Sequence, residues 1–192
     1  KILIMNKLNQ NRKILITGAS GFLGKELTDM LKEKYDVFGC SRREKNSKMF
    51  FADLANEEDI KILQENIDPS IILHAAGLKD LKRCEEDPEL AYLTNTKLIE
   101  NLCRNFKKSK IIYISTDYVF GGNKGMYEES DIPNPSTVYG KSKLLGEEIG
   151  FQVCPDNFKV IRTASIFSKN SSFIRFLDKM IATDSKFDAY CD

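Results

Sequence analysis

Short apolar runs alternate with segments of helical periodicity along the whole chain. Runs rich in β-branched residues predict buried strands over residues 13–17, 35–40, 70–74, 110–115 and 158–162. Segments with apolar residues three or four positions apart predict helices over residues 22–34, 56–66, 88–106, 139–151 and 172–181. Because strands that alternate with helices form right-handed βαβ units, we predict an α/β fold, a doubly wound parallel sheet with helices on both faces.

The composition and charge of the chain bear on which kinds of partner it can be expected to bind. The chain has 192 residues, 42% of them hydrophobic, which is enough for one large buried core. Its 29 basic residues nearly balance its 28 acidic ones, so no net field would attract nucleic acid or an anionic membrane. The apolar stretch at residues 2–5 is too short for a signal sequence or a membrane span. We therefore expect neither nucleic acid nor a membrane as partner.

The cysteines indicate a reducing compartment. There are five of them, an odd number, and none has CxxC or other metal-ligand spacing. Cys40 and Cys103 fall in apolar stretches, where a free thiol behaves as a small hydrophobic side chain. We expect five unpaired thiols, no metal site and a cytoplasmic protein.

A glycine-rich turn joins the first predicted strand to the first predicted helix. Gly18, Gly21 and Gly24 have GxxGxxG spacing there. The first glycine permits a tight turn, the second lets the backbone approach a diphosphate, and the third lets the helix pack on the strand. The N–H groups at the helix N-terminus then face the phosphates. This context predicts a dinucleotide site in a Rossmann fold, rather than a turn that only packs.

The residues after the second predicted strand bear on which dinucleotide binds. An NAD site usually has an acidic residue there for the ribose hydroxyls. Here the strand leads into Ser41, Arg42 and Arg43, with no acid before Glu44. Arginine suits a 2′-phosphate, so NADP is favoured and NAD stays possible, unless the two arginines are merely exposed charges.

Hydroxyl and amino groups are expected at the same edge of the sheet. Ser115 and Thr116 end a predicted strand, while Tyr139 and Lys143 lie four residues apart on one helix face. A phenol has a pKa of about 10, and an ammonium about 4 Å away stabilises the phenolate by up to roughly 4 kcal/mol. Lys143 is therefore expected to lower the pKa of Tyr139 by at most about three units. Thr116 or Ser115 would hold a carbonyl oxygen during hydride transfer.

Together these motifs resemble the extended short-chain dehydrogenase/reductase family, and within it the dTDP-4-dehydrorhamnose reductase (RmlD-like sugar-nucleotide-binding) group. The similarity covers roughly residues 13–167. Beyond the glycine turn, the Tyr139-x-x-x-Lys143 pair and the run from Ser115 to Phe120, it includes Asp53-Leu54, His74-Ala75-Ala76-Gly77, Cys84-Glu85-x-Asp87-Pro88, Asn95 and Arg162-Thr163.

The resemblance implies a role for each matching residue. The implied catalytic residues are Thr116, Tyr139 and Lys143. The implied cofactor-binding residues are Gly18, Ser20, Gly21, Phe22, Leu23, Gly24, Ser41, Arg42, Asp53, Leu54, Ala75, Ala76, Gly77, Tyr139 and Lys143. Asp53 and Leu54 would flank the adenine. His74, the sole histidine, would be structural, and Asn95, Tyr118 and Phe120 would pack.

The resemblance also divides the chain. Residues 1–11 are expected to form a disordered N-terminal extension, and residues 12–170 an NAD(P)-binding Rossmann domain. Residues 171–192 would begin a C-terminal substrate domain that is largely missing. The loop over residues 121–138 either covers bound substrate or is an ordinary surface excursion.

The function implied is an NADP-dependent reductase of a nucleotide-linked 4-keto sugar, in surface polysaccharide biosynthesis. The same catalytic residues also serve epimerases and dehydratases of nucleotide sugars that hold NAD tightly. A third interpretation is a non-catalytic, dinucleotide-binding regulatory subunit. A nucleotide-sugar substrate is the expected partner, and the sequence leaves a homodimer open.

Overall fold

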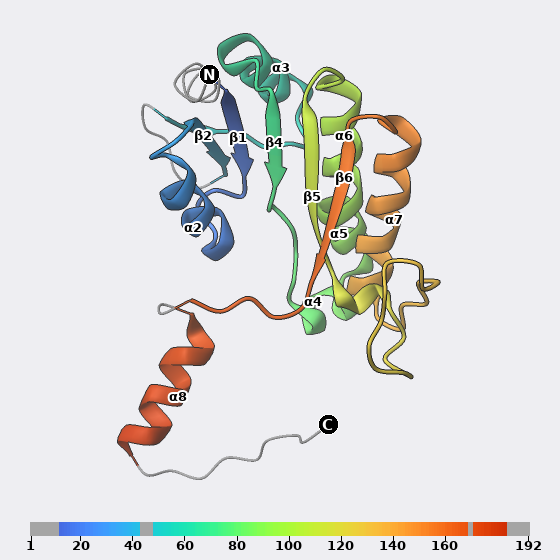
Figure 1. Cartoon of the computed structure of the whole chain (residues 1–192). Coiled ribbons are helices and arrows are strands. Elements are labelled where there is room, and N and C mark those ends of the chain that lie inside the picture. The colour runs from blue at the N-terminus through green and yellow to red at the C-terminus, as the bar shows by residue number, and fades with distance from the viewer. Residues whose placement is uncertain (1–11, 43–47, 169–170, 184–192) are drawn as a thin grey trace, which may run out of the picture.

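The computed structural model describes residues 12–42, 48–168 and 171–183. Within them, a sheet of six parallel strands runs in the order β3-β2-β1-β4-β5-β6 (Figure 1). The strands are β1 (Lys13–Thr17), β2 (Asp36–Ser41), β3 (Met49–Phe51), β4 (Ile71–His74), β5 (Lys110–Thr116) and β6 (Phe158–Thr163). The predicted doubly wound sheet is confirmed. Its strand order reverses between β1 and β4, and ligands bind at this point in such folds.

Helices connect the strands. They are α2 (Phe22–Leu31), α3 (Glu57–Ile67), α4 (Leu81–Glu86), α5 (Pro88–Tyr92), α6 (Leu98–Asn105), α7 (Val138–Val153) and α8 (Ser172–Ala182). A π-helical turn, η1 (Leu93–Lys97), links α5 to α6, and a 3₁₀ turn, η2 (Asp117–Val119), follows β5. No helix in the described ranges is long and apolar enough to cross a membrane.

Alternation along β1 divides the core between the two faces of the sheet. Leu15 points into a cluster that contains residues of α3 and α6. Ile14 and Ile16, its neighbours in sequence, point to the opposite face, against Leu27 and Leu31 of α2. Successive side chains of a strand alternate between faces, so one strand serves both layers.

The sequence-based boundaries were accurate where local signals are strong. Asn56 caps α3 as predicted, because its side chain accepts hydrogen bonds from the N–H groups of Glu58 and Asp59. The helix ends at Asp68, whose φ of 45° is left-handed, just before Pro69.

Two local predictions were wrong, and two short elements were missed. The first helix ends at Leu31 rather than residue 34, and the helix expected over residues 88–106 is interrupted by the π turn η1. Strand β3 and helix α4 were missed, since three and six residues are too few for a periodic signal. The expected N-terminal extension, residues 1–11, lies outside the described residues.

The segment after β6 turns back toward the first half of the chain. Ser168 donates a hydrogen bond of 3.0 Å to Glu26 of α2. Figure 1 shows α8 at the carboxyl-end side of the sheet. The assignment of residues 12–170 to a dinucleotide-binding domain, and of residues 171–192 to a separate substrate portion, stays a prediction.

Candidate active site

The glycine turn has the geometry that a diphosphate needs. Gly18 has a φ of +67°, a left-handed conformation that favours glycine, and its carbonyl accepts a hydrogen bond of 2.8 Å from Gly21 N–H. A Cβ on Gly24 would stand 2.3 Å from that carbonyl oxygen, so only glycine lets α2 pack on the turn. Gly21 caps α2 without a side chain, and the first helical turn contains no acidic residue. The helix N-terminus is therefore open to an anion.

A cavity of about 360 Å³ opens beside this turn, at the carboxyl ends of β1, β2 and β4. Ten of the predicted cofactor-binding residues line it: Gly18, Ser20, Gly21, Ser41, Arg42, Asp53, Leu54, Ala75, Ala76 and Gly77. It also has lining residues that the sequence did not reveal, namely Cys40, Ala52, Lys79, Thr94 and Leu98. The residues brought together come from five separate stretches of the chain.

Five predicted cofactor residues do not line the cavity: Tyr139 and Lys143 lie on α7, and the other three follow the glycine turn. Phe22, Leu23 and Gly24 form the first turn of α2 and are absent from the lining of the cavity. Gly24 is buried beneath the Gly18 carbonyl, so its part is to bring the helix close. Contacts of Phe22 and Leu23 with a cofactor stay a prediction.

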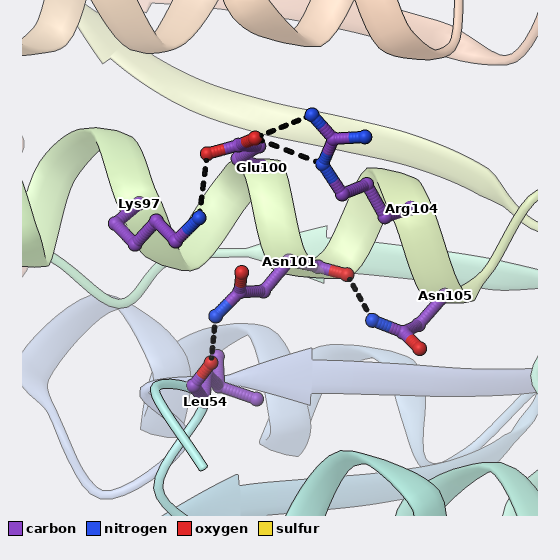
Figure 2. Close-up of polar contacts among 6 residues, drawn as sticks. All are labelled: Leu54, Lys97, Glu100, Asn101, Arg104 and Asn105. Carbon is purple, nitrogen blue, oxygen red and sulfur yellow. Dashed lines mark hydrogen bonds and ion pairs between the residues drawn. The ribbon is translucent and has the colours of Figure 1, made fainter. Parts of the chain in front are cut away.

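One end of the cavity is formed by the loop after β3, which contains Asp53 and Leu54. Arg42, at the end of β2, lies 3.9 Å from the Asp53 carboxylate and is largely exposed. Asp59 accepts a 2.7 Å hydrogen bond from the backbone N–H of Asp53. From α6, Asn101 donates its side-chain amide to the Leu54 carbonyl at 2.9 Å (Figure 2). Asn101 is thus a supporting residue that the sequence analysis missed, because nothing local marks a contact across 47 residues.

Strand β5 and helix α7 bring the three predicted catalytic residues together. Thr116 ends β5, and Tyr139 and Lys143 lie in the first half of α7. The Thr116 hydroxyl donates to the Asp117 carboxylate at 3.1 Å and accepts a 3.2 Å bond from Tyr118 N–H, and it lies near enough to the Tyr139 phenol to lower its pKa. The Lys143 ammonium donates to the Ile114 carbonyl at 2.6 Å and lies 3.8 Å from the centre of the Tyr113 ring. Lys143 is buried, with only 4% of its surface exposed.

The expected electrostatic effect of Lys143 on Tyr139 was wrong for this arrangement. The pKa of Tyr139 is raised, because burial outweighs the hydrogen bond from Thr116 that lowers it. Burial also lowers the pKa of Lys143 to about 7, with the Glu147 charge acting in the opposite direction. Tyr139 is therefore a protonated phenol at neutral pH, suited to donating a proton.

The structure also separates the two hydroxyls at the end of β5. The Ser115 hydroxyl donates to the Glu147 carboxylate and is buried with it, whereas Thr116 contacts Tyr139. Of the two candidates for holding a carbonyl oxygen, only Thr116 is beside the tyrosine. Ser115 belongs instead to the hydrogen-bond network of Glu147.

His74 and Asn95 are packing residues, as predicted. His74 is fully buried, its Nδ1 is hydrogen-bonded to the Thr17 hydroxyl at 2.7 Å, and burial lowers its pKa to about 3. Asn95, in the π turn, donates to Ser142 of α7 and exchanges hydrogen bonds with the backbone of Leu78. This π turn also places Thr94 at the cavity, which a regular helix pattern does not predict.

The predicted packing of the aromatic residues is confirmed as well. Tyr118 contacts the Tyr139 ring edge-on at 5.7 Å between centroids, and Phe120 stacks on Tyr127 of the following loop at 4.5 Å. Four cysteines, Cys40, Cys84, Cys103 and Cys154, are buried free thiols. Burial raises the pKa of Cys40 and of Cys103 to about 12, so both are unreactive. Cys191 lies outside the described residues.

These residues fit a dinucleotide. The turn has no side chain where the diphosphate would approach, and a Cβ on Gly18 would stand 2.7 Å from Ala76 N. The same cavity is also lined by Arg42, Asp53 and Leu54, which follow the next two strands. Thr116, Tyr139 and Lys143 do not line this cavity; Thr116 lies at the carboxyl end of β5, the same edge of the sheet, with the other two on α7.

Comparison with known proteins identifies the family. The RmlD substrate binding domain family matches residues 12–190. The chain belongs to this family. It is therefore an RmlD-like member of the extended short-chain dehydrogenase/reductases, as the motifs predicted.

Individual relatives of this RmlD-like chain have different names. It is 33% identical over 159 residues to methionine adenosyltransferase 2 subunit beta of Danio rerio, a match covering 82% of the chain and 49% of that protein. It is 31% identical over 188 residues to the spore coat polysaccharide biosynthesis protein SpsK of Bacillus subtilis, covering 94% and 62%. The chain spans about half to two thirds of the length of these relatives.

A solved structure agrees with the fold. The dTDP-4-dehydrorhamnose reductase of Bacillus anthracis, determined in complex with NADP, superimposes with a TM-score of 0.82 at 28% identity. The alignment covers 92% of this chain and 62% of that one. The RmlD-like fold therefore extends over nearly the whole described chain.

Proposed function

We propose that this chain forms the dinucleotide-binding and catalytic part of an NADP-dependent reductase of nucleotide-linked 4-keto sugars. The observation that carries the proposal is the placement of Thr116, at the end of β5, beside Tyr139 and Lys143 of α7, at the sheet edge that also bears the glycine turn. The reductase from B. anthracis, which binds NADP, supports the cofactor and the substrate class. The similarity to SpsK supports a place in polysaccharide biosynthesis.

The chain's own residues have distinct parts in this reaction. NADPH would supply the hydride when bound along the cavity beside Gly18 and Gly21. The Thr116 hydroxyl would orient the substrate's carbonyl oxygen, and Tyr139, protonated at neutral pH, would donate the proton that turns this oxygen into a hydroxyl. The Lys143 ammonium would stabilise the tyrosinate left behind.

The first test is oxidation of NADPH with a panel of 4-keto nucleotide sugars, including dTDP-4-dehydrorhamnose. We expect Tyr139→Phe to lower kcat by roughly 10²-fold or more while the Kd for NADPH stays unchanged. The matched control is Tyr35→Phe, which changes a tyrosine packed beside α2, on the other side of the core. Equal turnover by Tyr139→Phe and the wild type would contradict the proposal.

A non-catalytic dinucleotide-binding subunit is the second candidate, favoured by the similarity to methionine adenosyltransferase 2 subunit beta. It predicts tight NADPH binding with no turnover of any sugar in the panel. An epimerase or dehydratase predicts NAD retained through purification, which acid extraction of the purified protein would detect. The same preparation of protein thus separates the three functions.

A further inference from the structure

Three consecutive residues of β5 contact three residues of α7 that lie one turn apart. The Thr116 hydroxyl lies beside the Tyr139 phenol, and the Ile114 carbonyl accepts from Lys143. Between them, the Ser115 hydroxyl donates to Glu147. Residues four apart share a helix face, so Tyr139, Lys143 and Glu147 form one row toward the strand. Only the first two belong to the proposed reaction centre.

Glu147 is the buried end of this row. It is 2% exposed, and its carboxylate receives the Arg162 guanidinium at 2.7 Å as well as the Ser115 hydroxyl. Arg162 belongs to β6 and pairs in register with Ser115, so one carboxylate links β5, β6 and α7. The Arg162 guanidinium also lies 5.0 Å from the centre of the Phe120 ring. Burying a carboxylate is unfavourable unless it is fully paired. An apolar side chain of similar size would fill this position without that desolvation cost.

We propose that Glu147 is a positioning residue for the reaction centre: it fixes the end of β5 against α7 through Ser115 and Arg162, and places a buried negative charge one helical turn from Lys143. The strand it fixes presents Thr116 to Tyr139 and the Ile114 carbonyl to Lys143. The charge it supplies favours the ammonium form of Lys143, against the desolvation that favours the neutral amine.

The other groups around Lys143 do not replace this charge. Tyr113 of β5 offers the face of its ring and stays neutral, since burial raises its pKa. His74 of β4 is also neutral near pH 7, because its pKa is lowered to about 3. On α7 itself, Tyr139 is a neutral phenol. Among these groups Glu147 is the one anion, with Arg162 of β6 partly neutralising it.

The charge state of Lys143 tests the proposal without any substrate. The ε-carbon resonance of ¹³C-labelled lysine is titrated by NMR, and Lys143 is assigned by its loss in Lys143→Arg. We expect Glu147→Gln to move the Lys143 midpoint down by on the order of one pH unit. Arg162→Gln, which leaves the carboxylate without its cation, should move the midpoint up. General structural damage would not move the Lys143 midpoint in opposite directions in the two variants.

Glu100 on α6 provides a matched control. It too is a carboxylate held by two cations, Lys97 at 3.0 Å and Arg104 at 2.7 Å, but it lies outside the row on α7 (Figure 2). Glu100→Gln should leave the Lys143 midpoint unchanged. A Glu147→Gln midpoint within the error of the wild type would overturn the proposal. If Glu147→Gln does not fold, the proposal is overturned by a Lys143 midpoint in Arg162→Gln that is unchanged or lower than in the wild type.

The kinetic consequence rests on the proposed function. With its midpoint near 6 instead of about 7, Lys143 would be charged roughly tenfold less often at slightly alkaline pH, so kcat of Glu147→Gln should fall by about that factor. The KM for the sugar should stay the same. If the wild type turns over no sugar yet the two midpoints shift as expected, the proposed function fails and the positioning role stands.

Discussion

Asn101 of α6 donates its side-chain amide to the carbonyl of Leu54, across 47 residues of sequence, at 2.9 Å (Figure 2). Leu54 and its neighbour Asp53 line the cavity beside the glycine turn. The hydrogen bond therefore ties the position of a cavity loop to helix α6, whose residues share a core cluster with Leu54. Asn101 itself does not line the cavity, so its influence on the binding site would pass through Leu54.

The first prediction follows from this contact. Asn101→Ala should weaken NADPH binding about fivefold, because a lost hydrogen bond of about 1 kcal/mol lets the loop relax. Fluorescence titration with NADPH measures the effect. The control is Asn105→Ala, whose amide donates to the Asn101 carbonyl within the helix. Should both variants bind NADPH equally well, Asn101 has no part in holding the loop.

The second prediction concerns the close approach of α2 to the glycine turn. Gly24→Ala puts a methyl group 2.3 Å from the Gly18 carbonyl oxygen, a backbone atom that cannot move away cheaply. We expect about 1–3 kcal/mol of destabilisation in urea unfolding and a loss of NADPH binding. Gly125→Ala is the control, since its methyl would meet nothing within 4 Å. Normal binding and stability of Gly24→Ala would show that the turn tolerates displacement of the helix.

The third prediction concerns the choice between NADPH and NADH. Arg42 lines the cavity, and among the residues that the structure describes its ion-pair partner is the Asp53 carboxylate, at 3.9 Å. Arg42→Gln should raise the Kd for NADPH roughly tenfold and leave that for NADH unchanged, because only NADPH has a 2′-phosphate. Arg104→Gln, which removes an arginine paired with Glu100 on α6, should change neither. Equal affinity of the wild type for both dinucleotides would refute the preference.

The fourth prediction concerns stability against acid. Burial lowers the pKa of His74 from 6.5 to about 3, so the unfolded chain binds a proton that the folded one does not. Stability is therefore lost as pH falls below about 6.5, by up to about 1.4 kcal/mol per pH unit until the folded pKa is reached. Between pH 7 and pH 5, the wild type should lose about 2 kcal/mol more than His74→Gln in urea unfolding. Because His74 is the sole histidine, no other imidazole contributes to this difference. If the free energies of unfolding of the two proteins fell by the same amount between pH 7 and pH 5, the contribution of His74 would be ruled out.

The predicted residues that came together are those with strong local signals. Gly18 and Gly21 were recognisable because a strand precedes them and a helix follows, and parallel strands bring their carboxyl ends to one edge. The same rule placed Ala75 to Gly77 and Thr116 near that turn. Lys79 and Thr94 line the cavity without any such signal, since their positions depend on a short helix and a π turn.

The sequence by itself determined the alternation of the longer strands and helices, the glycine turn and the spacing of Tyr139 and Lys143 on one helix. Each follows from periodicity or from the steric freedom of glycine, which act over a few residues. Only the tertiary structure decided that Ser115 bonds Glu147 while Thr116 lies beside Tyr139, and that Lys143 donates to Ile114. It also reversed the expected direction of the Tyr139 pKa. Desolvation and hydrogen-bond partners depend on every element packed around a group, and no local pattern contains that information.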